Sequence, residues 1–226
     1  MKRRSCPSPN FNARALPVSV LVLHYTGMET GKAAIARLAD PEARVSAHYV
    51  VEEDGTIIAM VDEAMRAWHA GVSYWRGITD LNSASIGIEI VNGGHDFGLP
   101  DYPEAQIDAV IALGREIIAR HTITPVNVTG HSDIAPGRKI DPGEKFPWDR
   151  LAQEGVGLWP EGAKPAEPDE ARAAGLLAAI GYNPDLALGV VLTEFQRRYR
   201  PSRLDGLLDD ETMGLIEALA GKARAA

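Results

Sequence analysis

Near the middle of the chain lies the stretch Thr129-Gly-His-Ser-Asp-Ile-Ala-Pro-Gly-Arg-Lys-Ile-Asp-Pro-Gly143. It holds a histidine, a lysine and an aspartate, and its prolines and glycines are typical of a shaped loop. The preceding residues 126–128 predict a short strand, so His131 is expected where that strand ends. Loops anchored on a strand commonly carry binding and catalytic groups. Imidazole and carboxylate suit a metal ion, although the composition of the loop alone favours a solvated surface loop.

A second histidine has a similar setting near the start of the chain. His24 ends the run Val18-Ser-Val-Leu-Val-Leu-His24, which is apolar enough for a buried strand. Histidines at the ends of two core strands can meet at one edge of a sheet. We therefore expect His24, His131 and Asp141 to bind one zinc ion and to leave its fourth position open for water. No short regular motif joins the three residues, so spacing alone does not establish the site.

Glu89 lies inside the otherwise apolar strand pattern Ile86-Gly-Ile-Glu-Ile-Val91. A buried carboxylate without a partner is costly, so Glu89 must be paired or must face a cavity. One interpretation is an alternating strand whose polar side meets solvent. The other, which we favour, is a catalytic base whose pKa is raised by burial.

Five short blocks occur in a fixed order along the chain. They are Val22-Leu-His-Tyr-Thr26, Val45-Ser-Ala-His-Tyr-Val50, Ala67-Trp-His-Ala-Gly71, Ser85-Ile-Gly-Ile-Glu-Ile90 and Gly130-His-Ser-Asp-Ile-Ala-Pro-Gly-Arg-Lys-Ile-Asp-Pro-Gly143. Together they resemble the zinc-dependent N-acetylmuramoyl-L-alanine amidases of the AmpD and AmiD type, from about Val18 to Trp159. The resemblance implies an α/β fold, with a mixed β-sheet flanked by helices. It also implies hydrolysis of the amide between the lactyl group of N-acetylmuramic (or 1,6-anhydro-N-acetylmuramic) acid and L-alanine of the stem peptide.

The resemblance also assigns expected roles to individual residues. Glu89 is expected to take a proton from water and to return it to the leaving amine. Lys139 is expected to stabilise the tetrahedral oxyanion. Trp68 and His69 are expected to line the substrate groove, although a packed loop anchor is the alternative. Arg44 is expected to pair with a carboxylate of the peptide, although a plain surface arginine is nearly as good a reading.

Turn residues, a proline-rich stretch and changes in apolar periodicity divide the chain into segments. An irregular N-terminal arm is expected over residues 1–17 and the catalytic domain over 18–157. Asp54-Gly55 predicts a hairpin, and apolar residues at helical spacing predict a long helix from Glu104 to His121. The proline-rich residues 158–168 predict a linker. Residues 169–226 predict a small three-helix domain that resembles peptidoglycan-binding domains, although a helical buttress for the enzyme is an equal alternative.

Composition limits the remaining possibilities. The formal net charge of −8 does not support nucleic-acid binding, and the single cysteine excludes an internal disulfide. No run is apolar enough for a membrane span or a signal segment, so a cytoplasmic enzyme of peptidoglycan recycling is expected. The alternatives are a periplasmic wall amidase whose signal is missing from the sequence and a non-catalytic protein that binds wall fragments. Nothing in these patterns indicates an oligomeric state.

Overall fold

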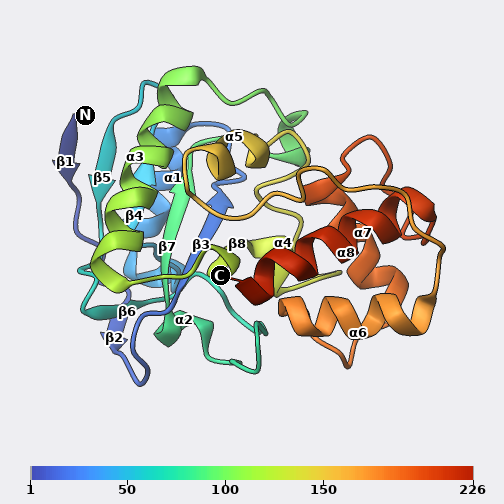
Figure 1. Cartoon of the computed structure of the whole chain (residues 1–226). Helices are drawn as coiled ribbons and strands as arrows, with labels where there is room; N and C mark the ends of the chain where they lie inside the picture. Colours follow the sequence, from blue (N-terminus) through green and yellow to red (C-terminus); the bar gives the residue numbers. More distant parts are fainter. Residues whose placement is uncertain (1, 226) are drawn as a thin grey trace.

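A mixed sheet forms the centre of the computed structural model, which describes residues 2–225 (Figure 1). Its strand order is β1-β5-β4-β7-β3-β8. In chain order these strands are β1 (Arg3–Ser5), β3 (Val20–Tyr25), β4 (Tyr49–Val51), β5 (Ile57–Ala59), β7 (Ser85–Ile90) and β8 (Val128–Gly130). β3 runs parallel to β7 and β8, whereas β4 and β5 form the antiparallel hairpin predicted at Asp54-Gly55. The predicted mixed α/β sheet is thereby confirmed.

The two faces of β3 belong to different layers of the protein. Leu21 and Leu23 pack in the core that includes the apolar side of α3 (Glu104–His121). Val20 and Val22 belong to the opposite core, which is shared with the C-terminal helices. Because side chains alternate along a strand, His24 lies on the same face as Val20 and Val22. The strand therefore turns His24 away from α3.

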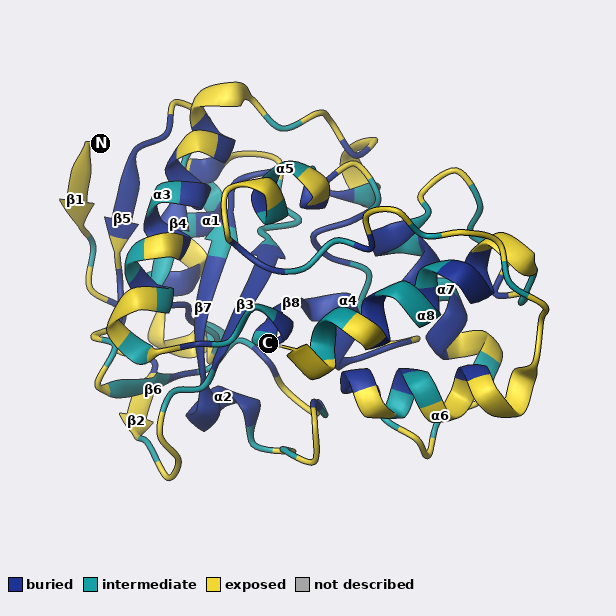
Figure 2. Ribbon diagram, in the orientation of Figure 1, coloured by how far each residue is buried: buried dark blue, intermediate teal, exposed yellow. Residues whose placement is uncertain are grey.

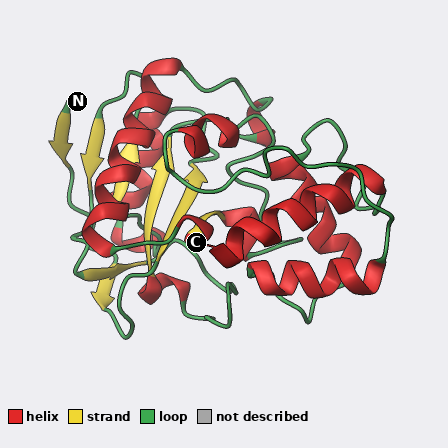
Figure 3. Ribbon diagram, in the orientation of Figure 1, coloured by secondary structure: helices red, strands yellow, loops and turns green. Residues whose placement is uncertain are grey.

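Helices cover both faces of the sheet (Figure 3). α3 has the bounds predicted from its apolar periodicity. α1 (Gly31–Ala39) begins where the Thr30 hydroxyl accepts the Ala33 amide proton at 3.2 Å, and its Leu38 packs on β4 and β5 from the side opposite α3. The remaining helical segments of this part are η1 (Pro41–Ala43), α2 (Leu81–Ala84), η2 (His95–Phe97), η3 (Pro125–Asn127), α4 (His131–Ile134) and α5 (Trp148–Gln153).

The N-terminal arm is not irregular as the sequence suggested. β1 adds to the sheet edge parallel to β5, and β2 (Phe11–Ala13) pairs antiparallel with β6 (Met65–Ala67). Both segments are only three residues long and exposed. Segments of this length have no readable periodicity, and their backbone pairing with distant strands supplies the order instead.

The strand before His131 lies slightly later than predicted. Pro125–Asn127 form a 3₁₀ turn, and β8 occupies Val128–Gly130. His131 then begins the one-turn helix α4, which the glycine and proline content of the loop had concealed. The shift places His131 directly at the carboxyl end of a core strand.

Three C-terminal helices were predicted, and the structure has them as α6 (Glu170–Ile180), α7 (Leu188–Tyr199) and α8 (Asp210–Ala225). They share one hydrophobic cluster with the sheet, in which Leu177 and Phe195 join Val20, Val22 and Trp75. Figure 2 shows buried residues continuing from the central strands into these helices. The division of the chain at residues 158–168 stays a prediction. Within residues 2–225, no helix has both the length and the apolar character needed to cross a bilayer.

Candidate metal centre and active site

The carboxyl ends of three neighbouring parallel strands bring the predicted site residues together. On one side of β3, His24 lies opposite Glu89 of β7. On the other side, Leu23 pairs with Gly130, the last residue of β8, so His131 follows at the level of His24. Residues more than a hundred positions apart therefore meet because parallel pairing sets their register.

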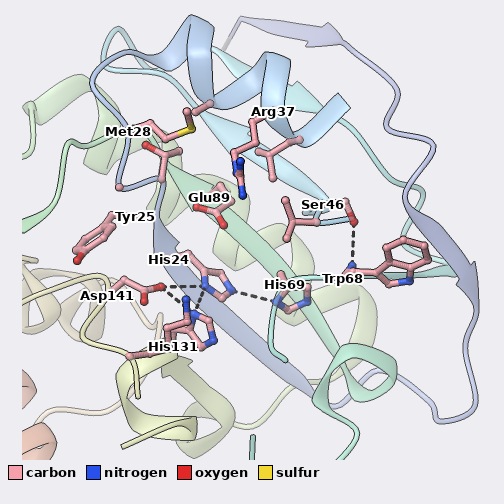
Figure 4. A pocket seen from close by; sticks show the side chains of 16 residues that line it. His24, Tyr25, Met28, Arg37, Ser46, Trp68, His69, Glu89, His131 and Asp141 are labelled. Atoms are coloured by element: carbon pink, nitrogen blue, oxygen red, sulfur yellow. Dashed lines mark hydrogen bonds and ion pairs between the residues drawn. The ribbon is translucent and has the colours of Figure 1, made fainter. Parts of the chain in front are cut away.

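Three donor atoms converge beside these strand ends (Figure 4). His24 Nδ1 lies 3.0 Å from His131 Nδ1 and 3.0 Å from Asp141 Oδ2, and His131 Nδ1 lies 3.1 Å from the same oxygen. All three residues, which we call the His-His-Asp cluster, are buried. The backbone carbonyl of Asp141 accepts a hydrogen bond from the Ser132 amide at 2.9 Å, which ties the loop to α4.

A chain of hydrogen bonds determines which nitrogen of His24 faces the cluster. The Leu81 carbonyl can only accept, so the Ser85 hydroxyl donates to it. Ser85 Oγ then accepts from His69 Nε2 at 3.3 Å, and His69 Nδ1 accepts from His24 Nε2 at 3.0 Å. In the neutral imidazole of His24 the proton therefore lies on Nε2, and the lone pair of Nδ1 faces the cluster.

His131 is oriented in the same way by a backbone carbonyl. Its Nε2 lies 3.1 Å from the Ala70 oxygen and donates to it, which leaves the Nδ1 lone pair free. The Arg138 guanidinium donates to the same carbonyl at 2.8 Å and so fixes that acceptor. Outer hydrogen bonds that fix the tautomer of an imidazole are characteristic of metal-binding histidines.

The protonation states favour a cation at this point. Burial is the main reason that the pKa of His24 falls to about 4, so its imidazole is neutral at physiological pH. Burial alone would raise the pKa of Asp141, but the neighbouring His131 and His24 hold it below its ordinary value, so it stays ionised. Two imidazole nitrogens and one carboxylate fit the ligand set of a divalent metal such as zinc.

Glu89 is the carboxylate beside the cluster. Burial, and then the charge of Asp141, raise the pKa of Glu89 well above its ordinary value, while Lys139 opposes the shift. Its Oε2 atom has no hydrogen-bond partner among residues 2–225. A carboxylate that faces a cavity in this state is placed to accept a proton from a molecule that enters it.

A cavity of about 330 Å³ opens at the cluster, and Glu89 and Lys139 both lie in its wall. Trp68 lines it as well, and the Trp68 indole nitrogen donates to Asn12 Oδ1 at 2.7 Å. His69, predicted to contact substrate, also lies in the wall, but its ring nitrogens are both engaged between His24 and Ser85. The Trp-His motif does not reveal this orienting role, because the partners come from other strands.

The structure does not place Arg44 in this wall. Its backbone is left-handed, with φ 53°, and its side chain is exposed outside the lining of the cavity. The arginine in the wall is Arg37 of α1, whose guanidinium points toward the cavity in Figure 4. A sequence reading centred on motifs overlooks Arg37, since only the packing of α1 on the sheet brings it there.

The family of N-acetylmuramoyl-L-alanine amidases matches residues 14–144. The chain is 41% identical over 232 residues to N-acetylmuramoyl-L-alanine amidase AmiD of Escherichia coli, which covers 91% of this chain and 83% of that protein. It is 36% identical to 1,6-anhydro-N-acetylmuramyl-L-alanine amidase AmpD of Salmonella typhimurium, over 67% of this chain and 89% of that protein.

Solved structures show the same relationship over nearly the whole chain. A complex of the E. coli amidase AmiD with anhydro-N-acetylmuramic acid-L-Ala-D-gamma-Glu-L-Lys has a TM-score of 0.82 and covers 93% of this chain and 92% of that one. AmpDh3 of Pseudomonas aeruginosa, in complex with an anhydromuramic pentapeptide, is 37% identical with a TM-score of 0.81, covering 91% and 92%. Both matches extend into the C-terminal helices.

Proposed function

The chain belongs to the N-acetylmuramoyl-L-alanine amidase family, and from this premise we propose that it hydrolyses anhydromuropeptides with one zinc ion held by His24, His131 and Asp141. The bond cleaved is the amide between the lactyl group of the muramic acid and L-alanine. The observation that carries the proposal is the convergence of three oriented donor atoms beside Glu89 Oε2, an atom without a hydrogen-bond partner among residues 2–225.

In this proposal the residues of the chain divide the chemistry among them. Zinc supplies Lewis acidity toward the amide carbonyl and lowers the pKa of water. Glu89 accepts a proton from the attacking water and delivers it to the departing amine of L-alanine. Lys139 presents its positive charge to the oxygen that becomes negative in the tetrahedral state. Trp68 forms one wall against the sugar or peptide.

Arg37 is the proposed contact for the stem peptide. In the substrate bound to AmiD, glutamate is joined through its γ-carboxyl, which leaves its α-carboxylate free. A guanidinium recognises a carboxylate through paired hydrogen bonds. Arg37 lies in the wall of the cavity, and this position supports it in the role that the sequence suggested for Arg44.

We expect the Arg37→Gln variant to raise KM for a peptide with free D-glutamate carboxylate, with little change in kcat. A charge-assisted hydrogen bond contributes about 1.5–3 kcal/mol, so KM should rise on the order of tenfold or more. The measurement compares kinetics on this peptide and on its D-isoglutamine analogue, which lacks the charge. Arg44→Gln is the matched control and should behave as the wild type. Equal losses on both peptides would remove Arg37 from carboxylate recognition.

The Gly87→Ala variant tests the support behind His24. A Cβ at position 87 would lie 2.6 Å from the His69 ring, so the ring must move and its hydrogen bond to His24 is lost. Losing such an outer hydrogen bond typically weakens metal binding 10–100-fold. Zinc affinity is measured by competition with a chelator. Gly175→Ala in α6, where a Cβ meets nothing within 4 Å, is the control and should bind zinc normally. Unchanged affinity in Gly87→Ala would contradict the orienting role of His69.

Metal content and one assay test the function as a whole. Purified protein should hold one zinc ion per chain and release the peptide from soluble anhydromuropeptides. Absence of zinc together with retained activity would sink the proposal. A wall amidase is the second candidate, favoured by the match to AmiD across the C-terminal helices. Digestion of intact sacculi as fast as of soluble fragments would select it.

The cytoplasmic location expected from the sequence stays a prediction. Fractionation of cells that express the native gene tests it directly. Enzyme in the periplasm would contradict it and would support the role in wall degradation.

A further inference from the structure

A buried ion pair joins α7 to α4, the helix that begins with the metal ligand His131. Arg198 donates through Nη1 to Asp133 Oδ2, and both side chains are almost fully buried. Arg198 also donates through Nη2 to the Val128 carbonyl of β8 at 3.1 Å. Its guanidinium stacks on the Trp148 ring, 3.8 Å from the centroid. One arginine of the C-terminal helices therefore contacts β8, α4 and α5 at once.

Both carboxylate oxygens of Asp133 accept hydrogen bonds that fix α4. Its Oδ2 accepts the amide proton of Gly130, the residue directly before His131, at 2.8 Å. Its Oδ1 accepts from the Tyr182 hydroxyl at 2.7 Å. Tyr182 follows α6, so two separate segments of the C-terminal part converge on this single carboxylate. The Asp133–Arg198–Tyr182 cluster thus spans the predicted linker and ends at the backbone that carries His131.

Stability alone is a poor reason for such a cluster. Removing two charges from water costs about as much as their attraction returns, and apolar residues of similar volume often stabilise equally well or better. What a buried cluster of hydrogen bonds does provide is one fixed geometry, even though Arg198 Nε has no hydrogen-bond partner among residues 2–225. Here that geometry is the junction of β8 and α4, where an error of orientation would move His131 Nδ1 away from His24 and Asp141.

We propose that the Asp133–Arg198–Tyr182 cluster positions His131, so that the C-terminal helices are a structural part of the metal centre. The inference rests on the proposed zinc site. It gives these helices a role that requires no binding of the cell wall. It also implies that the catalytic part, cut at the predicted linker, binds zinc weakly, because Asp133 loses both Arg198 and Tyr182.

The test measures zinc affinity of the full chain by chelator competition, beside thermal unfolding and kinetics. Arg198→Met removes the ion pair and keeps much of the apolar stem. Arg76→Met is its control, since Arg76 donates to the Ile180 carbonyl across the same junction at 2.9 Å and has no hydrogen bond to α4 within the described part of the chain. Tyr182→Phe removes only the hydroxyl that Asp133 accepts. Tyr199→Phe is the same change in the same core, where Tyr199 packs on Phe195.

We expect Arg198→Met to weaken zinc binding 10–100-fold, as loss of an outer support does, and to lower kcat more than it raises KM. Tyr182→Phe should show a smaller loss of zinc affinity. Arg198→Lys should lose less affinity than Arg198→Met, because lysine keeps the charge without the planar fork. The two controls should bind zinc as the wild type does. Should Arg198→Met fail to fold, the pair Tyr182→Phe and Tyr199→Phe decides.

Two results would overturn the inference while leaving the amidase intact. One is wild-type zinc affinity in folded Arg198→Met and Tyr182→Phe. The other is an equal loss in the controls, which would indicate general loosening of the junction. A wild-type chain that binds no zinc at all is a different outcome, because it overturns the proposed function itself.

Discussion

The Glu89→Gln variant should retain one zinc ion per chain and lose at least about a hundredfold in kcat, the usual scale for a general base. Glutamine preserves the shape of the side chain but cannot accept the proton of the attacking water. Zinc should stay because Glu89 is not one of the three converging ligands. The measurement pairs metal analysis with kinetics on a soluble anhydromuropeptide.

Glu144→Gln is the matched control for this variant. Glu144 follows the loop that carries Asp141, but its carboxylate is already bound by His95 at 3.0 Å and by Arg197 at 2.7 Å. It is therefore not available as a base, and its loss should change kcat little. A Glu89→Gln enzyme with near-normal kcat would remove Glu89 from proton transfer, and equal losses in the two variants would point to a general disturbance of the site.

Local patterns in the sequence predicted the framework of the site. The apolar run before His24 required a buried strand, and the periodicity from Glu104 to His121 required a helix of those bounds; both exist. Glu89 stood out because a carboxylate inside an apolar strand is costly unless it is paired or faces a cavity. Each of these inferences uses residues within a few positions of one another, where spacing along the chain translates directly into a shared face.

Features that depend on distant partners were not predictable. His69 orients His24 only because Gly87, on a neighbouring strand, leaves room for the ring. Arg37 reaches the cavity wall through the packing of α1, which no motif encodes. The ion pair of Asp133 with Arg198 joins residues 65 positions apart, and no local sequence pattern around either residue indicates its partner. Tertiary contacts decide such roles.

Loss of the metal should have the largest effect of all. We expect Asp141→Ala to abolish stoichiometric zinc binding and to reduce amidase activity to background. Asp141 is the only anionic member of the His-His-Asp cluster, and its oxygen lies within 3.1 Å of both donor nitrogens. Without it, only two imidazoles remain as ligands, a set too weak to hold a divalent ion firmly.

Chelation of the wild-type protein provides the independent measurement. An ion that binds only the folded state stabilises it by about 2.7 kcal/mol when free metal exceeds Kd a hundredfold, so a chelator should lower the Tm of the wild type. Asp141→Ala should have the same Tm with and without chelator. Returning zinc should restore activity and Tm to the chelated wild type but not to the variant. Activity that survives complete chelation would show that hydrolysis does not depend on a metal ion. His24, His131 and Asp141 would then form a buried polar network without a metal.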